Sequence, residues 1–128
     1  MRLLSQLVLS LCTLSACGDD QADGPTACEA GPSIVSEAIR SLLASEPPCA
    51  RDADCVSVSF DVACGGYSTV SCNEIVHRDT AARWNAAAVC KHIDDVTVAS
   101  NYSCSTLAAC LGPGVPTCRA GKCTGTER

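Results

Sequence analysis

The clearest hydrophobic pattern in the chain is a stripe of apolar residues at helical spacing between residues 33 and 45. Such a stripe predicts an amphipathic helix whose apolar side faces the core. Ser33 is placed to cap the start of this helix, and Pro47 and Pro48 are placed to end it. The apolar positions of the stripe are Ile34, Val35, Ala38, Ile39, Leu42 and Leu43.

A second helix is expected in the middle of the chain. Ser71 and Glu74 have the spacing of a capping box, in which each residue hydrogen-bonds the backbone of the other. The helix would begin at this pair and run to about Ile93, with an alanine-rich face that allows close packing on a sheet. Asp79 and Thr80 could instead divide it into two pieces.

Strand signals lie between and after these helices. Apolar and polar residues alternate in residues 56–62, as expected of a half-buried strand, and residues 96–99 are a second, shorter candidate. Residues 118–123 predict a terminal hairpin, with Ala120 and Gly121 near its turn. Together these elements predict an α+β fold, in which one or two helices pack on a short antiparallel sheet.

Cysteine content changes this picture, because the chain has twelve cysteines but one Trp, one Phe and two Tyr. A core built largely from small residues stabilises a domain only weakly. An even number of cysteines in a short exported chain indicates a disulfide framework, and five cross-links of about 2–4 kcal/mol each would compensate for the small core. The sequence leaves their connectivity open, and the absence of a C-x-x-C pair argues against a zinc or thioredoxin-type site. The ten disulfide candidates are Cys28, Cys49, Cys55, Cys64, Cys72, Cys90, Cys104, Cys110, Cys118 and Cys123.

The N-terminus has the features of an export signal. Arg2 precedes an apolar stretch, residues 3–14, which is shorter than the roughly 20 residues that span a bilayer and matches the apolar region of a signal peptide. The stretch ends in Leu14-Ser15-Ala16-Cys17, which resembles the lipobox of bacterial lipoproteins. The resemblance implies that residues 1–16 are removed and that Cys17 carries the lipid of a membrane anchor.

The alternative is an ordinary signal peptide that is cut after Ala16. That cleavage favours small residues one and three positions before the cut, whereas Leu14 is large. It would also leave Cys17 as an odd thiol in an oxidising compartment.

The rest of the chain divides into a tether and a domain. Residues 18–27 are polar, acidic and without periodicity, so residues 17–27 are expected to form the lipidated cysteine and a flexible tether. Residues 28–128 are expected to form the disulfide-rich globular domain. The net charge of −5 becomes −6 when Arg2 is removed, which argues against nucleic acid and anionic lipid surfaces as partners.

Two sets of polar residues are candidates for chemistry. Asp52, Asp54 and Asp61 lack the spacing of an EF-hand loop and are expected to be solvated carboxylates. His77 and His92 are expected to be exposed, and on a single helix they would lie about 22 Å apart, too far to share a site. A Gly-x-Ser-x-Gly elbow is also missing. We therefore expect no enzyme activity, no catalytic residue, no metal and no cofactor.

The layout of residues 49–123 carries a second resemblance. It consists of Cys-x5-Cys-Val before a strand, a Cys-Gly turn, an alanine-rich helix, and a closing Pro-Thr-Cys-Arg-Ala-Gly-Lys-Cys segment. This layout resembles the small Cys-rich lipoproteins that are frequent in myxobacteria and their relatives and that have no established activity. The resemblance implies a compact α+β fold and an envelope location, and it transfers no catalytic residue.

These observations favour a membrane-anchored lipoprotein of the cell envelope with a binding or structural role. Its expected partners are the membrane, through the lipid, and an envelope or extracellular protein. The outer membrane is favoured over the inner one, with the domain in the periplasm or at the cell surface. The alternative is a secreted, disulfide-rich inhibitor or toxin-like module, which would use an exposed loop such as residues 49–55 or 111–116.

Overall fold

The computed structural model describes residues 23–126, so the predicted signal peptide, the lipobox-like segment and Cys17 lie outside the described residues. Within that range the predicted disulfide-rich α+β class is confirmed. The helical segments are α1 (Ala27–Ala44), the 3-10 turn η1 (Asp52–Asp54), α2 (Arg78–Ala82) and α3 (Ala86–Val96). The strands are β1 (Cys55–Val58), β2 (Val62–Ala63), β3 (Tyr67–Val70), β4 (Glu74–His77), β5 (Cys104–Leu107), β6 (Val115–Arg119) and β7 (Lys122–Thr126).

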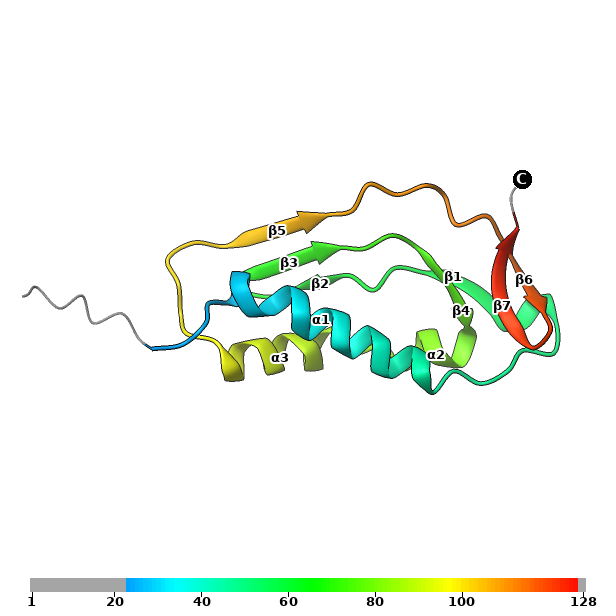
Figure 1. Ribbon diagram of the computed structural model, residues 1–128, viewed down its shortest axis with the longest axis horizontal. Helices are drawn as coiled ribbons and strands as arrows, with labels where there is room; N and C mark the ends of the chain where they lie inside the picture. The colour runs from blue at the N-terminus through cyan, green and yellow to red at the C-terminus, as the bar shows by residue number, and fades with distance from the viewer. Residues whose placement is uncertain (1–22, 127–128) are drawn as a thin grey trace, which may run out of the picture.

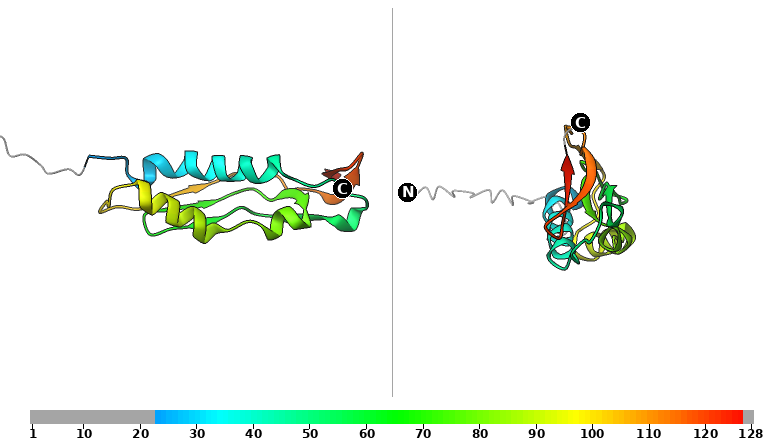
Figure 2. Two further views of the ribbon diagram at one scale, coloured as in Figure 1. Left: turned by 90° about the horizontal axis from the view of Figure 1, so that it is seen from below. Right: turned by 90° about the vertical axis from the view of Figure 1, so that its right-hand side faces the viewer.

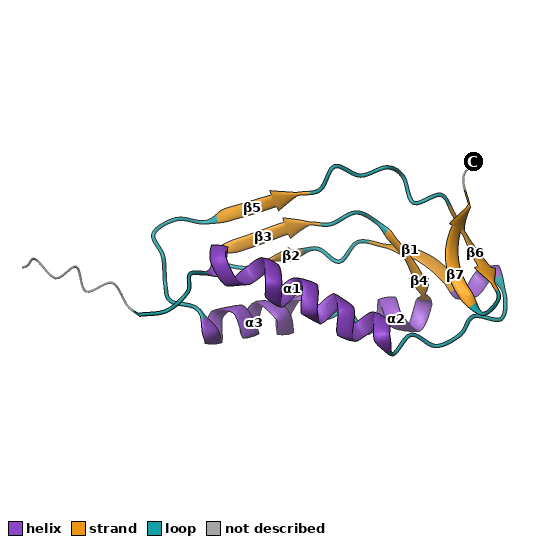
Figure 3. Cartoon of the chain, in the orientation of Figure 1, coloured by secondary structure: helices purple, strands orange, loops and turns teal. Residues whose placement is uncertain are grey.

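The strands of residues 23–126 form three small sheets (Figure 1, Figure 3). β1 pairs antiparallel with β4, and β6 pairs antiparallel with β7. The third sheet has the order β2-β3-β5, in which β3 and β5 are parallel, so this sheet is mixed where an antiparallel one was expected. α1 and α3 run alongside the mixed sheet, and the β6–β7 hairpin lies at the other end of the long axis from the start of α1 (Figure 1, Figure 2).

α1 begins well before its apolar stripe, at a capping box formed by Thr26 and Glu29. Oε2 of Glu29 accepts hydrogen bonds from the backbone N–H and the hydroxyl of Thr26, at 2.8 and 3.0 Å. These bonds, first of all the one from the backbone, hold the pKa of Glu29 below its usual value. The predicted cap at Ser33 is wrong, because Ser33 and Pro32 lie inside the helix and the Ser33 hydroxyl donates to the carbonyl of Ala30.

The folded part of the chain therefore begins before Cys28. Thr26 forms a parallel bridge with Val98, and the backbone N–H of Val98 donates to the carbonyl of Pro25 at 3.0 Å. Residues 25–27, expected in the tether, thus belong to the domain. The strand expected at residues 96–99 is reduced to this single bridge, because α3 extends to Val96.

The alternating residues 56–62 form two strands in different sheets, β1 and β2, instead of one. Between them, the backbone N–H of the buried Phe60 donates to the hydroxyl of Ser71 at 2.8 Å. Oδ1 of Asp61 accepts from the backbone N–H of Ser71, also at 2.8 Å, so Asp61 is a backbone acceptor and not simply a solvated carboxylate. These contacts fix the point at which the chain leaves one sheet and enters the next.

The same contacts show why the second helix was predicted to begin too early. Ser71 uses its hydroxyl for Phe60 and its N–H for Asp61, so it caps no helix. Glu74, the other half of the predicted capping box, is the first residue of β4. Pairing with β1 over the whole length of β4 overrides the local helix signal.

Two helices follow β4, divided at residues 83–85. Asp79 and Thr80, the alternative point of division, lie inside α2, and Thr80 is fully buried. Oδ1 of Asn85 accepts from the backbone N–H of Ala88 at 3.0 Å and so caps α3.

The terminal hairpin is confirmed. Arg119 and Lys122 are the last paired residues of β6 and β7, and Ala120 and Gly121 form the turn. Both turn residues have positive φ, 50° and 76°, as a two-residue type I′ turn requires.

All ten cysteine candidates form disulfides, which gives five cross-links within residues 23–126. Their partners are separated by 26 to 76 positions, so each bond closes a long loop and removes entropy from the unfolded chain. The pairs are Cys28–Cys104, Cys49–Cys118, Cys55–Cys123, Cys64–Cys90 and Cys72–Cys110.

The apolar core lies between α1, α3 and the β2–β3 pair. Gly31 brings α1 close to the buried ring of Tyr67, because a Cβ at this position would lie 2.7 Å from ring carbons. The Tyr67 hydroxyl is 3.2 Å from the hydroxyl of Thr106 on β5, which restrains the ring. The core residues are Val35, Val62, Tyr67, Val89 and Ile93.

Gly31→Ala is expected to destabilise the domain, since its methyl group would overlap the Tyr67 ring. Alanine gains roughly 1 kcal/mol over glycine inside a helix, but overpacking should exceed this and give a net loss of about 1–2 kcal/mol in the free energy of unfolding. Chemical denaturation with the disulfides intact measures the difference. Gly65→Ala is the matched control, because its Cβ meets no atom within 4 Å. Equal stability of the two variants would contradict this packing.

Candidate interaction surface

A long interval of the chain carries no charge. No charged side chain occurs between Asp95 and Arg119, a stretch that contains β5, the loop after it and most of β6. The 14 acidic and 9 basic residues all lie outside it. Another molecule can therefore approach this stretch without desolvating a charge.

β5 forms an outer edge of the mixed sheet (Figure 1). The backbone N–H groups of Cys104 and Ala108 donate to carbonyl oxygens in or beside β3, at 3.3 and 3.2 Å. Because successive residues of a strand alternate, Ser105 and Leu107 direct their N–H groups to the opposite side. That row of backbone groups can pair with another extended chain.

Large apolar side chains are exposed along the same border. Leu107 is 79% exposed, Leu111 94% and Tyr102 64%. Leu107 lies opposite Val70 in the β3–β5 ladder, and Val70 is also exposed. We call residues 102–111 the uncharged edge. Apolar side chains beside open backbone groups are suited to a protein contact.

Disulfides hold the uncharged edge at both ends. Cys28–Cys104 joins the start of β5 to α1, and Cys72–Cys110 joins the segment after β5 to the connection between β3 and β4. Edge strands are usually protected by charged residues or proline, and the sequence of this edge has neither. Within residues 23–126 the result is a fixed edge that no other segment covers and that loses little entropy on binding.

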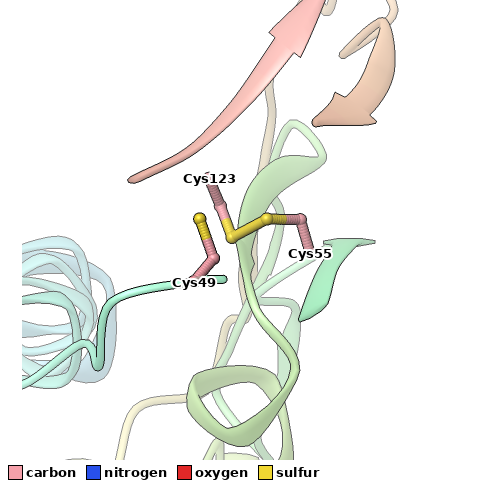
Figure 4. A group of neighbouring side chains, drawn as sticks. All are labelled: Cys49, Cys55 and Cys123. Carbon is pink, nitrogen blue, oxygen red and sulfur yellow. A yellow bond between two sulfur atoms is a disulfide. The ribbon is translucent and has the colours of Figure 1, made fainter. Parts of the chain in front are cut away.

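A second group of side chains gathers at the hairpin end of the molecule. The Sγ atoms of Cys49, Cys55 and Cys123 all lie within 4.8 Å of one another (Figure 4). This spacing is close to that of a thiolate metal site, but all three sulfurs are in disulfides, whereas a metal ligand has to be a thiolate. In the oxidised protein the group is a contact between two disulfides.

Two carboxylates close the loop beside this cluster: Asp52 is exposed, as expected, and Asp54 is partly exposed, but both also accept hydrogen bonds from the backbone. Oδ2 of Asp54 accepts from the backbone N–H groups of Ala50 and Arg51, at 2.9 and 3.1 Å. The bond from Ala50 is the main cause that holds the pKa of Asp54 below its usual 3.8. Oδ1 of Asp52 accepts from the backbone N–H of Cys118 at 2.8 Å, which ties the loop to the hairpin.

The expectation that both histidines are exposed is wrong for His77, which is only 9% exposed. Its Nδ1 accepts a hydrogen bond from the backbone N–H of Asp79 at 3.1 Å and so caps α2. The backbone N–H of His77 donates to the carboxylate of Glu46. His92 is exposed on α3. The histidines thus lie on different elements, and His77 has a structural role.

No helix within residues 23–126 combines the length and the apolar character needed to cross a membrane. No protein-family model, curated protein or solved structure matches the chain.

Asp54→Asn is expected to lower the thermal unfolding midpoint at neutral pH, because a neutral amide accepts the two N–H groups less strongly than a carboxylate. Since folding lowers the pKa of Asp54, its contribution is complete above the usual value of 3.8 and is lost as the pH falls below that value. The difference from wild type should therefore be constant well above that usual value and shrink progressively as the solution is made more acidic than it.

Circular dichroism melting curves at pH values on both sides of 3.8 measure the effect. Glu74→Gln, which removes an exposed charge from β4, is the control and should change the midpoint little at any pH. A difference between Asp54→Asn and wild type that stays constant with pH would contradict the role given to the carboxylate.

Proposed function

We propose that this protein is a lipoprotein of the bacterial cell envelope, anchored through Cys17, whose domain binds an extended segment of an envelope or extracellular protein. The observation that carries the binding role is the open side of β5, with Leu107 exposed beside it. The anchor is inferred from the Leu14-Ser15-Ala16-Cys17 segment.

The disulfides support an exported location. Every cysteine between Cys28 and Cys123 is paired, and disulfides of this kind form and persist in oxidising compartments. An exported chain with a lipobox-like segment is retained at a membrane, for which we favour the outer membrane over the inner one. The domain would then lie in the periplasm or at the cell surface.

The position of the uncharged edge suits an anchored protein. α1 begins at one end of the long axis, and β5 and the segment after it run along one side of the molecule (Figure 1). An anchor attached before α1 would leave this side open to a partner.

The edge also indicates the chemistry of the partner. Backbone hydrogen bonds to Ser105 and Leu107 would provide affinity for any extended segment. Tyr102, Leu107 and Leu111 would favour one with apolar side chains. The partner needs no basic patch to bind here, because the uncharged edge carries no acidic side chain.

Cys17→Ser tests the anchor. Wild-type precursor expressed in a bacterial host is expected to incorporate radioactive palmitate and to fractionate with membranes, because acylation at the thiol provides the anchor. The variant should lose both properties. A Cys17→Ser protein that is still labelled and still processed would contradict the lipid attachment.

A photocrosslinking residue in place of Leu107 tests the binding edge in cells. We expect a discrete protein adduct from this position and none from the same residue in place of Arg40, which is exposed on α1. Ser105→Pro should abolish the adduct, because it removes an outward N–H that makes no bond to β3, and should leave the unfolding midpoint nearly unchanged. Equal crosslinking from both positions, or an adduct that persists with Ser105→Pro, would contradict edge binding.

A further inference from the structure

Two disulfides meet where the β6–β7 hairpin covers the loop of residues 49–55. Cys49–Cys118 and Cys55–Cys123 link the two ends of this loop to the two strands of the hairpin. The Sγ atoms of Cys49, Cys55 and Cys123 lie within 4.8 Å of one another, and the fourth sulfur is bonded to that of Cys49 (Figure 4). Among the described residues, sulfurs of two disulfides gather in this way only here.

The backbone also accommodates a second way of pairing these four cysteines. Cys118 and Cys123 are direct partners in the β6–β7 ladder, and side chains at facing positions lie on the same side of a sheet, within reach of each other. Cys49 and Cys55 stand at the two ends of the loop, with their sulfurs already within 4.8 Å. The alternative pairs are therefore Cys49–Cys55 and Cys118–Cys123.

We propose that this cluster is a thiol–disulfide exchange site whose co-reactant is an external thiol. The incoming thiolate attacks Sγ of Cys118, which forms a mixed disulfide and releases the thiolate of Cys49. Cys49 attacks Sγ of Cys55, which forms Cys49–Cys55 and releases the thiolate of Cys123. Cys123 attacks Cys118, which forms Cys118–Cys123 and returns the external thiolate. Two disulfides exist before and after, so no oxidant or reductant is consumed.

Burial determines where the reaction starts. Cys49 and Cys55 are buried, whereas Cys118 and Cys123 are partly exposed, so an external thiolate reaches the hairpin sulfurs first. The Cys49 thiolate released inside then has the second disulfide as its neighbour. Its attack is intramolecular and has a high effective concentration.

The exchange changes what holds the hairpin. In the observed pairing two covalent bonds join it to the loop, and in the exchanged pairing none does. The remaining links include the bond from Cys49 N–H to the Gly121 carbonyl at 3.1 Å and the bond from Cys118 N–H to Asp52 at 2.8 Å. Attack by a thiol at this site thus frees residues 115–126 from both disulfide links to the loop of residues 49–55.

Cys118→Ser isolates the central step, because it leaves Cys49 as a free thiol beside Cys55–Cys123. The oxidised, folded variant is denatured in acid with N-ethylmaleimide, then reduced and labelled with iodoacetamide. Trypsin cuts after Arg40, Arg51 and Lys122, which places Cys49 and Cys123 on separate peptides with a single cysteine each. We expect maleimide on both peptides, with at least about a tenth of the free thiol moved away from Cys49.

Cys110→Ser is the matched control, because it frees Cys72, which has no second disulfide in such a group. Its maleimide should remain on Cys72, which is distinguished from Cys55 and Cys64 by fragmenting the tryptic peptide of residues 52–78. In wild-type protein treated with a small thiol, Cys49–Cys55 and Cys118–Cys123 should form at least roughly tenfold faster than any new pair involving Cys64, Cys72, Cys90 or Cys110. Maleimide confined to Cys49 in Cys118→Ser, or equal exchange at all disulfides in wild type, would overturn the proposal.

Discussion

Three of the disulfides, Cys28–Cys104, Cys49–Cys118 and Cys55–Cys123, join residues that lie 68 to 76 positions apart in the chain. The rest of the structure depends on such long-range links because its other sources of stability are small. The apolar core consists of side chains from two helices and two short strands. A two-stranded sheet such as β1–β4 or β6–β7 is marginal by itself. Covalent bonds between distant segments hold these sheets in one domain. Within residues 23–126 they leave the outer side of β5 without a strand partner.

The elements that sequence could predict are those whose residues interact locally. The hairpin at Ala120 and Gly121 was found because its turn chemistry is contained in two residues. The start of α1 was missed, although Thr26 and Glu29 carry a capping box, because the apolar stripe begins later. Ser71 carried the same local signature and formed no cap, since Phe60 and Asp61 occupy its hydrogen bonds. The signature does not show which tertiary partner competes for a side chain.

The uncharged edge could be predicted only in part, because its composition is local but its position depends on tertiary pairing. The uncharged interval between Asp95 and Arg119 can be read from the residues, but its place at the edge of a sheet depends on the parallel pairing of β3 with β5, across more than 30 positions. The ten disulfide candidates were all correct, whereas their connectivity needed the fold. His77 was expected to be exposed because a helix was assigned where β4 forms.

The Cys28–Cys104 bond also determines how the molecule carries mechanical load. Cys28 lies in the first turn of α1, and Cys104 is the first residue of β5. If the chain is pulled before α1 while β5 is held, the force passes through this disulfide. The non-covalent contacts of the apolar core then carry little of it. The packing between α1 and α3 then bears little of the tension, so the domain would keep its shape under forces that extract a helix held by non-covalent contacts alone.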